Sequence, residues 1–141
     1  MNRKKKFHLR VRGVICDGEN VLVARVKDGN YCFLPGGHHE IGESLADALV
    51  REIREELGMS ATVKQYLGVV ENGWQEEDAY HYEINHIFAV EVPFLNAKTN
   101  PRAEEDHLEF FWTTPDKFEK DNLLPAIIRP TLSGGGKGTM E

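Results

Sequence analysis

The segment 37–59 sets more residue types at defined spacing than any other part of this 141-residue chain. Gly37 is followed after five residues by Glu43, and after seven more by a run that begins at Arg51. That run carries three glutamates, Glu52, Glu55 and Glu56. Glutamates this close on one helix repel one another unless a cation lies among them. Clustered oxygen ligands suit Mg²⁺ or Mn²⁺, so the pattern predicts a metal-loaded site that cleaves a diphosphate.

The three glutamates are expected on one side of a helix that the sequence predicts over residues 44–57. At about 100° per residue, Glu55 lies near −60° from Glu52, and Glu56 lies near +40°. The apolar stripe of the same helix is centred near +110°. Glu52 and Glu56 should therefore lie beside the buried face, and Glu55 should point further out. Glutamates that served only solubility would more often lie opposite the apolar stripe of the helix. The position of Glu52 and Glu56 beside that stripe therefore favours a functional site.

Glu43 and Arg51 each have a structural and a functional interpretation. Glu43 or Ser44 can cap the helix, which the helix dipole favours, or Glu43 can be another carboxylate near the metal. Arg51 can pair with Asp47 one turn earlier, or it can hold a catalytic carboxylate in position. Each residue taken alone favours the structural interpretation, but their joint spacing favours the functional one.

The sequence indicates residues that contact substrate less clearly than it indicates the metal ligands. Gly36 and Gly37 are either simple turn residues or positions where the backbone approaches a phosphate. His38 and His39 enter the same segment and could contact phosphate, although exposed loop histidines are as common and His is a poor magnesium ligand. Trp74, in a polar stretch predicted to be a loop, could stack on a base.

The bulk composition describes an acidic globular chain. Lys and Arg number 17 against 23 Asp and Glu, so the formal charge is −6. An acidic protein is a poor default binder of nucleic acid backbones, and a divalent cation would offset local charge for a phosphate substrate. No apolar run is long enough to span a membrane. The two cysteines, Cys16 and Cys32, are expected to be buried free thiols, which favours a cytoplasmic location.

The elements around the site read as a mixed α/β (α+β) domain. Strands are expected at 8–16, 21–26, 31–34, 61–70, 80–92 and 108–113. A polar loop is expected at 72–78, and short helices are expected at 115–120 and 124–128. Tyr80 and Tyr82 share a face with apolar residues of the long strand, which predicts core packing. Residues 1–132 are expected to form one domain, and the glycine-rich residues 133–141 a flexible tail.

The segment 37–59 resembles the Nudix box, the signature of the Nudix hydrolase family. That pattern is Gly, five residues, Glu, seven residues, Arg-Glu, an aliphatic residue, any residue, Glu-Glu, any residue, Gly and an aliphatic residue. The matching residues are Gly37, Glu43, Arg51, Glu52, Ile53, Glu55, Glu56 and Gly58. Met59 departs from the final position, but methionine is apolar and still packs. Outside the box the resemblance is looser.

The resemblance implies an α/β/α sandwich with a mixed sheet and hydrolysis of a nucleoside diphosphate linked to another group. It implies that Glu52, Glu55 and Glu56 bind Mg²⁺ or Mn²⁺, with Arg51 and Glu43 as further catalytic residues. Such metals offset phosphate charge and make water a better nucleophile. Glu55 or Glu56 is the first candidate for the base that activates water. Some relatives use a glutamate in the late loop, here Glu104 or Glu105, for which a solvated loop charge is the plainer interpretation.

Two alternatives to a hydrolase stay open. A Nudix-fold module can sense a nucleotide without cleaving it, but such relatives usually carry a damaged box. The diphosphate isomerase branch shares the fold and needs a reactive cysteine near the metal, a role that strand positions of Cys16 and Cys32 do not suit. Within the hydrolases, the substrate ranges from small nucleotides and other diphosphates to capped RNA ends, and homodimers occur in the family.

Overall fold

The computed structural model describes residues 4–135 of the chain. Its main sheet has four strands in the order β4-β1-β6-β5. The bounds are Lys4–Val14 for β1, Gly36–His38 for β4, Thr62–Glu76 for β5 and Ala79–Glu91 for β6. β1 runs parallel to β6, whereas β1–β4 and β5–β6 are antiparallel. The sheet is therefore mixed, as expected from the sequence.

A second sheet has the order β2-β3-β7. Its strands are Cys16–Asp17, Asn20–Val26 and Leu108–Thr113. A tight hairpin joins β2 to β3, while β1 belongs to the main sheet. The strand expected at 31–34 is reduced to isolated bridges, which pair Phe33 with Ala24 and Cys32 with Leu123. Two 3₁₀ turns, Pro115–Lys117 and Ala126–Ile128, and helix α2, Arg129–Gly135, complete the chain.

Helix α1, Leu45–Leu57, forms where the apolar spacing predicts it. Ser44 is the N-cap, and its side chain accepts a hydrogen bond from the backbone N–H of Asp47. Gly58 ends the helix in the left-handed conformation, with φ of 68°, which glycine adopts without steric cost. Leu49 and Ile53 are fully buried, so this face of α1 anchors the helix to the main sheet.

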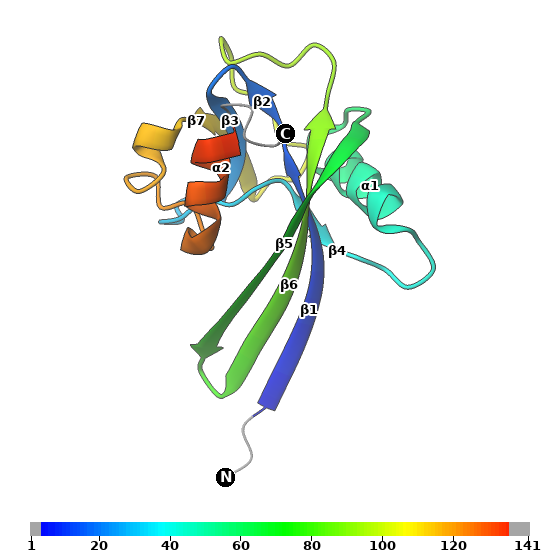
Figure 1. The fold of residues 1–141 in the computed structure, drawn as a ribbon, viewed down its shortest axis with the longest axis vertical. Coiled ribbons are helices and arrows are strands. Elements are labelled where there is room, and N and C mark those ends of the chain that lie inside the picture. Colours follow the sequence, from blue (N-terminus) through cyan, green and yellow to red (C-terminus); the bar gives the residue numbers. More distant parts are fainter. Residues whose placement is uncertain (1–3, 136–141) are drawn as a thin grey trace.

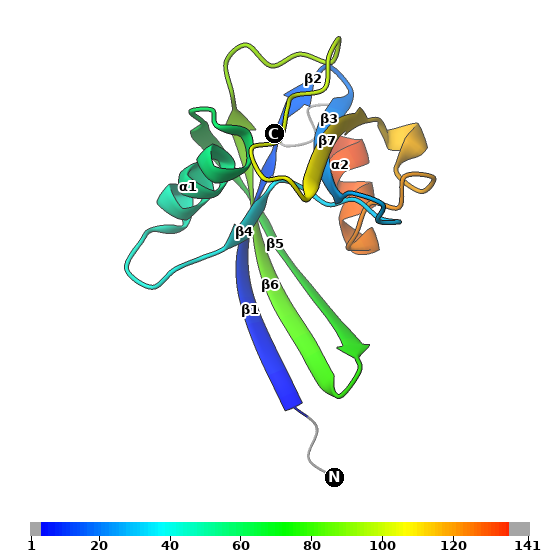
Figure 2. The same cartoon turned by 180° about the vertical axis from the view of Figure 1, so that it is seen from behind.

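The elements form three layers, with the main sheet in the middle (Figure 1). Helix α1 and the C-terminal helices lie on opposite sides (Figure 2), and the second sheet contributes to both cores, with Leu22 and Ala24 of β3 in the cluster of α1 and Val21 and Val23 in that of the C-terminal segment. Two apolar clusters fill these contacts. The first contains residues of α1, β1 and β6, such as Val11, Ile53 and Val90. The second joins β1, β3 and the C-terminal segment. This arrangement confirms the α/β/α sandwich.

Three strands of the main sheet continue beyond both core layers as an arm (Figures 1 and 2). The arm comprises residues 4–9 of β1, 70–76 of β5 and 79–85 of β6. The predicted loop at 72–78 is therefore wrong, because β5 extends to Glu76 and pairs with β6. Trp74 lies on a strand opposite His81. The polar sequence concealed this strand, since an arm with little apolar cover does not need an apolar alternation.

The same arm explains two further corrections. Tyr80 is 37% exposed, and the Tyr82 hydroxyl donates a hydrogen bond of 2.5 Å to Glu71 Oε1 at an exposed position. The predicted core packing of these tyrosines is wrong because the arm extends past the layers that would cover them. Of the two cysteines, Cys32 is buried as expected, but Cys16 is exposed on the short strand β2.

The end of the described region overlaps the predicted C-terminal tail. Helix α2 continues to Gly135, past the start of the predicted tail at residue 133. Residues 136–141 lie outside the described part, so a flexible tail there stays a prediction, as does the domain boundary at 132. Within residues 4–135, no helix has the length and hydropathy needed to cross a bilayer.

Candidate active site

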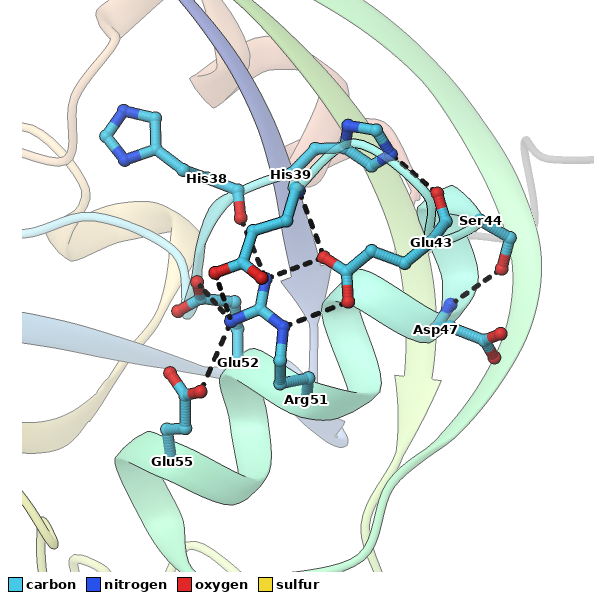
Figure 3. A network of polar contacts seen from close by, with 9 residues as sticks. His38, His39, Glu43, Ser44, Asp47, Arg51, Glu52 and Glu55 are labelled. Atoms are coloured by element: carbon cyan, nitrogen blue, oxygen red, sulfur yellow. Dashed lines mark hydrogen bonds and ion pairs between the residues drawn. The ribbon is translucent and has the colours of Figure 1, made fainter.

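Arg51 and Glu43 form the centre of a polar network at the start of α1 (Figure 3). Arg51 Nη2 donates to Glu43 Oε1 at 2.7 Å, and Arg51 Nε donates to Glu43 Oε2 at 3.0 Å. This two-point contact matches the planar guanidinium to both carboxylate oxygens. Hydrogen bonding to Arg51 lowers the pKa of Glu43 to about 2. Glu43 is therefore an anion at any neutral pH.

Arg51 also reaches the helix glutamates and the preceding strand. Its Nη1 donates to Glu52 Oε2 at 3.2 Å and to Glu55 Oε2 at 3.3 Å. Its Nη2 donates to the backbone carbonyl of His38 at 3.0 Å. The alternative pairing with Asp47 is not adopted in the described residues, because the guanidinium is turned toward Glu43. One cation thus orients three carboxylates and ties them to β4.

The three helix glutamates differ in burial as their positions on the helix predict. The Glu52 side chain is 15% exposed and that of Glu55 49%, whereas Glu56 is 6% exposed as a residue. Glu56 Oε1 accepts a hydrogen bond of 3.3 Å from the backbone N–H of Gly36. Burial raises the pKa of Glu56 to about 8, although Arg12 opposes the rise. Burial also raises the pKa of Glu52.

The two glycines of β4 allow these carboxylates to reach the strand. A Cβ on Gly37 would lie 2.5 Å from Glu52 Oε1, so any larger residue would displace that carboxylate. Gly36 has φ of 138°, and a Cβ there would overlap the carbonyl oxygen of Val11. The glycines are therefore required by close approach. Direct contact of either glycine with substrate stays a prediction.

The donor set fits a hard divalent cation. Glu52 and Glu56 are carboxylates held close together at a site where burial disfavours their charge, and a cation would offset both effects. Oxygen donors of this kind suit Mg²⁺ or Mn²⁺. Within residues 4–135, no three acidic, His or Cys side chains already converge on one point. Arg51 engages oxygens of Glu52 and Glu55 instead, so ligation would require these side chains to turn.

The late loop lies beside the same helix. The backbone N–H of Glu104 donates to the Glu56 carbonyl oxygen at 2.7 Å. A Cβ on Gly58 would lie 3.0 Å from Glu104 Oε2. The charge of Glu105 contributes to the raised pKa of Glu56. The fold therefore brings both predicted loop glutamates near the helix, which spacing along the chain did not reveal.

An open hollow of about 520 Å³ lies along this loop. Its lining includes Lys27, Arg102, Glu104, Glu105 and Glu109. None of the helix glutamates lines it, so the hollow adjoins the acidic cluster and does not contain it.

The predicted substrate-contact residues His38, His39 and Trp74 lie in different parts of the structure. His39 Nε2 lies 2.6 Å from the Glu43 carbonyl oxygen, which braces the loop before α1. The His38 ring points away from Arg51 (Figure 3), and its Nε2 lies 3.1 Å from His8 Nδ1. Trp74 stacks on rings of the arm. The fold thus separates His39 from His38 and Trp74. Contact of any of the three with substrate stays a prediction.

Arg12, on β1, is a site residue that the spacing of the box did not reveal. Its Nη1 donates to the Leu34 carbonyl oxygen at 2.9 Å, and its guanidinium lies 5.5 Å from the Phe33 ring centre. Although Arg12 keeps some exposed surface, burial lowers its pKa to about 10, and Glu56 and Glu52 oppose that change. The sequence carries one signal for Arg12. It follows the buried Val11 on an alternating strand, so its side chain lies on the opposite face of that strand.

Comparison with known proteins identifies the family of this chain. The family model described as the NUDIX domain matches residues 6–132. The chain belongs to the Nudix family. This match covers most of the chain, whereas the box alone covers only its central segment.

Among curated relatives, the Nudix chain is 36% identical over 104 residues to an ADP-ribose pyrophosphatase of Methanocaldococcus jannaschii, covering 72% of this chain and 59% of the relative. It is 31% identical over 115 residues to a CTP pyrophosphohydrolase of Escherichia coli, covering 79% and 78%. It is also 33% identical over 111 residues to an isopentenyl-diphosphate Delta-isomerase of Cereibacter sphaeroides, covering 70% and 59%. The chain spans about half of the two relatives that match first, 59% and 48% of their lengths.

Solved structures support the same fold. A MutT protein from Methanosarcina mazei aligns with a TM-score of 0.72 at 20% identity, covering 99% of this chain and 100% of that one. The Escherichia coli ORF135 protein aligns with a TM-score of 0.62 at 30% identity, covering 90% and 86%. Both alignments extend over nearly the whole Nudix chain.

Proposed function

We propose that this Nudix protein is a Mg²⁺- or Mn²⁺-dependent hydrolase that cleaves the diphosphate linkage of a nucleoside diphosphate derivative. The observation that carries the proposal is the ordering of Glu43, Glu52 and Glu55 by Arg51, beside the buried Glu56. A surface charge cluster would not bury a glutamate or leave its pKa raised. The names of the pyrophosphatase relatives support the same reaction class.

In the proposed reaction, water attacks one phosphorus atom of the diphosphate. A new P–O bond forms, the P–O bond of the anhydride bridge breaks, and the leaving phosphate keeps that bond's electron pair. The proton of the water passes to a carboxylate, for which Glu56 and Glu55 are the first candidates. A divalent cation held by Glu52, Glu55 and Glu56 would supply charge neutralisation of the phosphates and a more acidic water. Arg51 keeps Glu43 oriented through its two-point contact.

Glu56 is favoured over Glu55 as the proton acceptor. Glu56 is buried, and its Oε1 accepts a hydrogen bond from the backbone N–H of Gly36 rather than from an arginine. Glu55 is half-exposed and accepts a hydrogen bond from Arg51. Glu104 and Glu105 remain the second candidates, because the backbone of Glu104 is hydrogen-bonded to Glu56 and the charge of Glu105 raises the pKa of Glu56.

The proposal is tested with purified protein, Mg²⁺ and a panel that includes ADP-ribose, CTP and 8-oxo-dGTP, chosen from the names of relatives. Glu56→Gln should lower kcat on any substrate cleaved by at least about 100-fold, with the melting temperature preserved. Glu91→Gln, which removes an exposed partner of Lys64, is the matched control. Equal turnover by Glu56→Gln and the native protein would refute the assigned role, and ¹⁸O-labelled water would identify the phosphorus attacked.

Two other functions are less well supported. A sensing module would bind nucleotide without product, but every charged position of the box is intact. An isomerase would need a reactive thiol, but burial raises the pKa of the Cys32 thiol to about 12 within the second apolar cluster, and it also raises the pKa of the Cys16 thiol. The resemblance to isomerase relatives therefore supports the fold more than that chemistry.

A further inference from the structure

Four rings gather on one face of the arm, where β1, β5 and β6 lie side by side. Trp74 and His81 have ring centres 5.0 Å apart and planes within 5° of parallel. His8 lies 5.1 Å from His81 and 6.0 Å from Trp74, with interplanar angles of 9° and 10°. His38 is tilted by 35° and lies 5.2 Å from His8. We call Trp74, His81 and His8 the ring platform, because their planes are nearly parallel.

The histidines are joined by hydrogen bonds that fix the ring planes. His8 Nε2 lies 2.9 Å from His81 Nδ1, and His8 Nδ1 lies 3.1 Å from His38 Nε2. One set of neutral tautomers satisfies both contacts: His38 donates to His8, and His8 donates to His81. Burial lowers the pKa of His8 and of His38. Neutral, fixed rings are suited to stacking, because little conformational entropy is lost on contact.

The platform is contiguous with the acidic cluster. His38, which touches His8 through its ring, receives a hydrogen bond from Arg51 at its backbone carbonyl. On β1, His8 shares a sheet face with Arg10 and Arg12, since side chains alternate along a strand. Four residues at about 3.3 Å each separate His8 from Arg12, a span of about 13 Å. That span is comparable to the reach of a nucleoside diphosphate from phosphate to base.

The face between the platform and the glutamates is also built from polar residues. Asn85 is 2% exposed and Glu83 6%, although both are polar. Arg10 Nε lies 3.1 Å from Glu83 Oε1, yet it makes no hydrogen bond of good geometry within the described part of the chain. Buried polar groups on a sheet face are costly unless they have partners. Glu83 also accepts a hydrogen bond from Asn72, and Asn85 donates to the Val70 carbonyl oxygen, so among the described residues Arg10 Nε is the buried atom of this face that a polar ligand would satisfy.

Structural packing is the plain alternative for the platform. Rings can stiffen a three-stranded arm, since cross-strand aromatic pairs stabilise sheets. However, the arm projects past the layers of the core (Figure 1), and Trp74 stays only half-buried. A tryptophan used only for packing would gain more from full burial.

We propose that Trp74, His81 and His8 bind the planar heteroaromatic base of the substrate by stacking. The inference rests on the proposed function, which places the diphosphate at the helix glutamates. It selects nucleoside diphosphate derivatives over diphosphates that lack a base. Arg10 then lies between the two ends, where it faces the sugar–phosphate linker.

Binding is tested without turnover, with AMP, CMP, GMP and UMP as probes and ribose 5-phosphate as the base-free control. Trp112→Phe leaves Trp74 as the one tryptophan, so its fluorescence reports directly on the platform. At least one nucleoside monophosphate should quench it saturably, and ribose 5-phosphate should not. Absence of saturable quenching by all four would overturn the proposal.

Variants then separate stacking from folding. Trp74→Ala should raise the Kd of the quenching nucleotide by about tenfold in calorimetry, as expected for one lost stacking contact. Trp74→Phe should recover most of the affinity because it keeps a ring. Tyr66→Ala is the matched control, since Tyr66 is an exposed aromatic residue on β5 that pairs with Phe88 on the other face.

The outcomes distinguish this inference from the proposed function. If Trp74→Ala leaves every Kd within twofold of native while Glu56→Gln abolishes turnover, the platform is refuted and the hydrolase stands. If Trp74→Ala weakens nucleotide binding but no substrate is hydrolysed, the platform stands and the hydrolase does not. Equal weakening by Tyr66→Ala would assign the effect to the fold of β5 and overturn the platform.

Discussion

At the scale of single residues, Arg51 is the most consequential side chain of the site. Its five donors are spread over Glu43, Glu52, Glu55 and the His38 carbonyl oxygen. A lysine could not reproduce this arrangement, because it lacks the planar fork that contacts both oxygens of one carboxylate. The role of Arg51 is therefore to orient the carboxylates, and this role depends on the planar shape of its guanidinium.

Replacing Arg51 should consequently lower turnover even when positive charge is kept. We expect Arg51→Lys to reduce kcat and Mg²⁺ affinity by about 10–100-fold, the range typical of residues that orient ligands. Kinetics at several Mg²⁺ concentrations measure both quantities. Arg54→Gln, an exposed arginine on the same helix, is the control and should behave like the native protein. Native kinetics for Arg51→Lys would show that the fork is dispensable.

Glu56 should make the metal-free protein less stable as pH rises. Its folded-state pKa, about 8, is above its usual value of 4.5, so between these values the folded state binds more protons than the unfolded state. The free energy of unfolding therefore falls from about pH 4.5 to about pH 8. Melting temperatures in EDTA across this range should decline, and Glu56→Gln should flatten the decline. A native curve that rises with pH would contradict the assignment.

At the scale of elements, the site depends on how closely α1 approaches β4. The helix lies against a strand that begins with two glycines, so carboxylates of Glu52 and Glu56 reach the strand backbone. Ser44 and Gly58 define the ends of the helix and thereby the angular position of its glutamates. The residues of the box thus lie on one strand, one helix and the loop between them, and their spacing reflects the lengths of these elements.

Gly37→Ala should impair catalysis more than stability. The added Cβ would meet Glu52 Oε1 at 2.5 Å and displace that carboxylate, so we expect a loss in kcat of about 10-fold or more. Gly18→Ala is the converse control, since Gly18 has φ of 63° and no atom within 4 Å of the new Cβ. It should cost about 1–2 kcal/mol of stability and leave kcat unchanged. Assays paired with thermal melts decide between these outcomes.

At the scale of the whole molecule, segments distant in the sequence meet at α1 and on the arm. The loop at residues 96–107 docks on the helix through Glu104, and the arm brings Trp74 within stacking distance of His8 and His81. The sandwich supports these contacts because β1 is the central strand that borders both β4 and β6. The candidate site therefore extends beyond the box.

Removing the loop charge tests this long-range contact. Because the charge of Glu105 raises the pKa of Glu56, Glu105→Gln should shift the pH-dependent melting transition of metal-free protein toward lower pH. Glu109→Gln, which removes a partner of Arg25, is the control and should leave the transition in place. If Glu105→Gln also lowered kcat by about 100-fold or more, Glu105 would replace Glu56 as the favoured base.

The box residues could be predicted from sequence because they are local. Helical periodicity determines the relative directions of Glu52, Glu55 and Glu56, and the structure confirms their order of burial. Capping chemistry likewise determines the helix ends at Ser44 and Gly58. The mixed fold followed from alternating strands around one strong helix.

The remaining features depended on contacts that no local pattern encodes. The strand that carries Trp74 is polar because its arm extends past the core, so hydrophobic alternation could not reveal it. The closeness of Glu105 to Glu56 and of His8 to His81 arises from pairing between segments far apart in the chain. Sequence alone therefore determined the acidic helix, because its geometry is set by backbone periodicity. Tertiary structure decided what surrounds it, because strand register and loop docking follow from the energy of the whole fold.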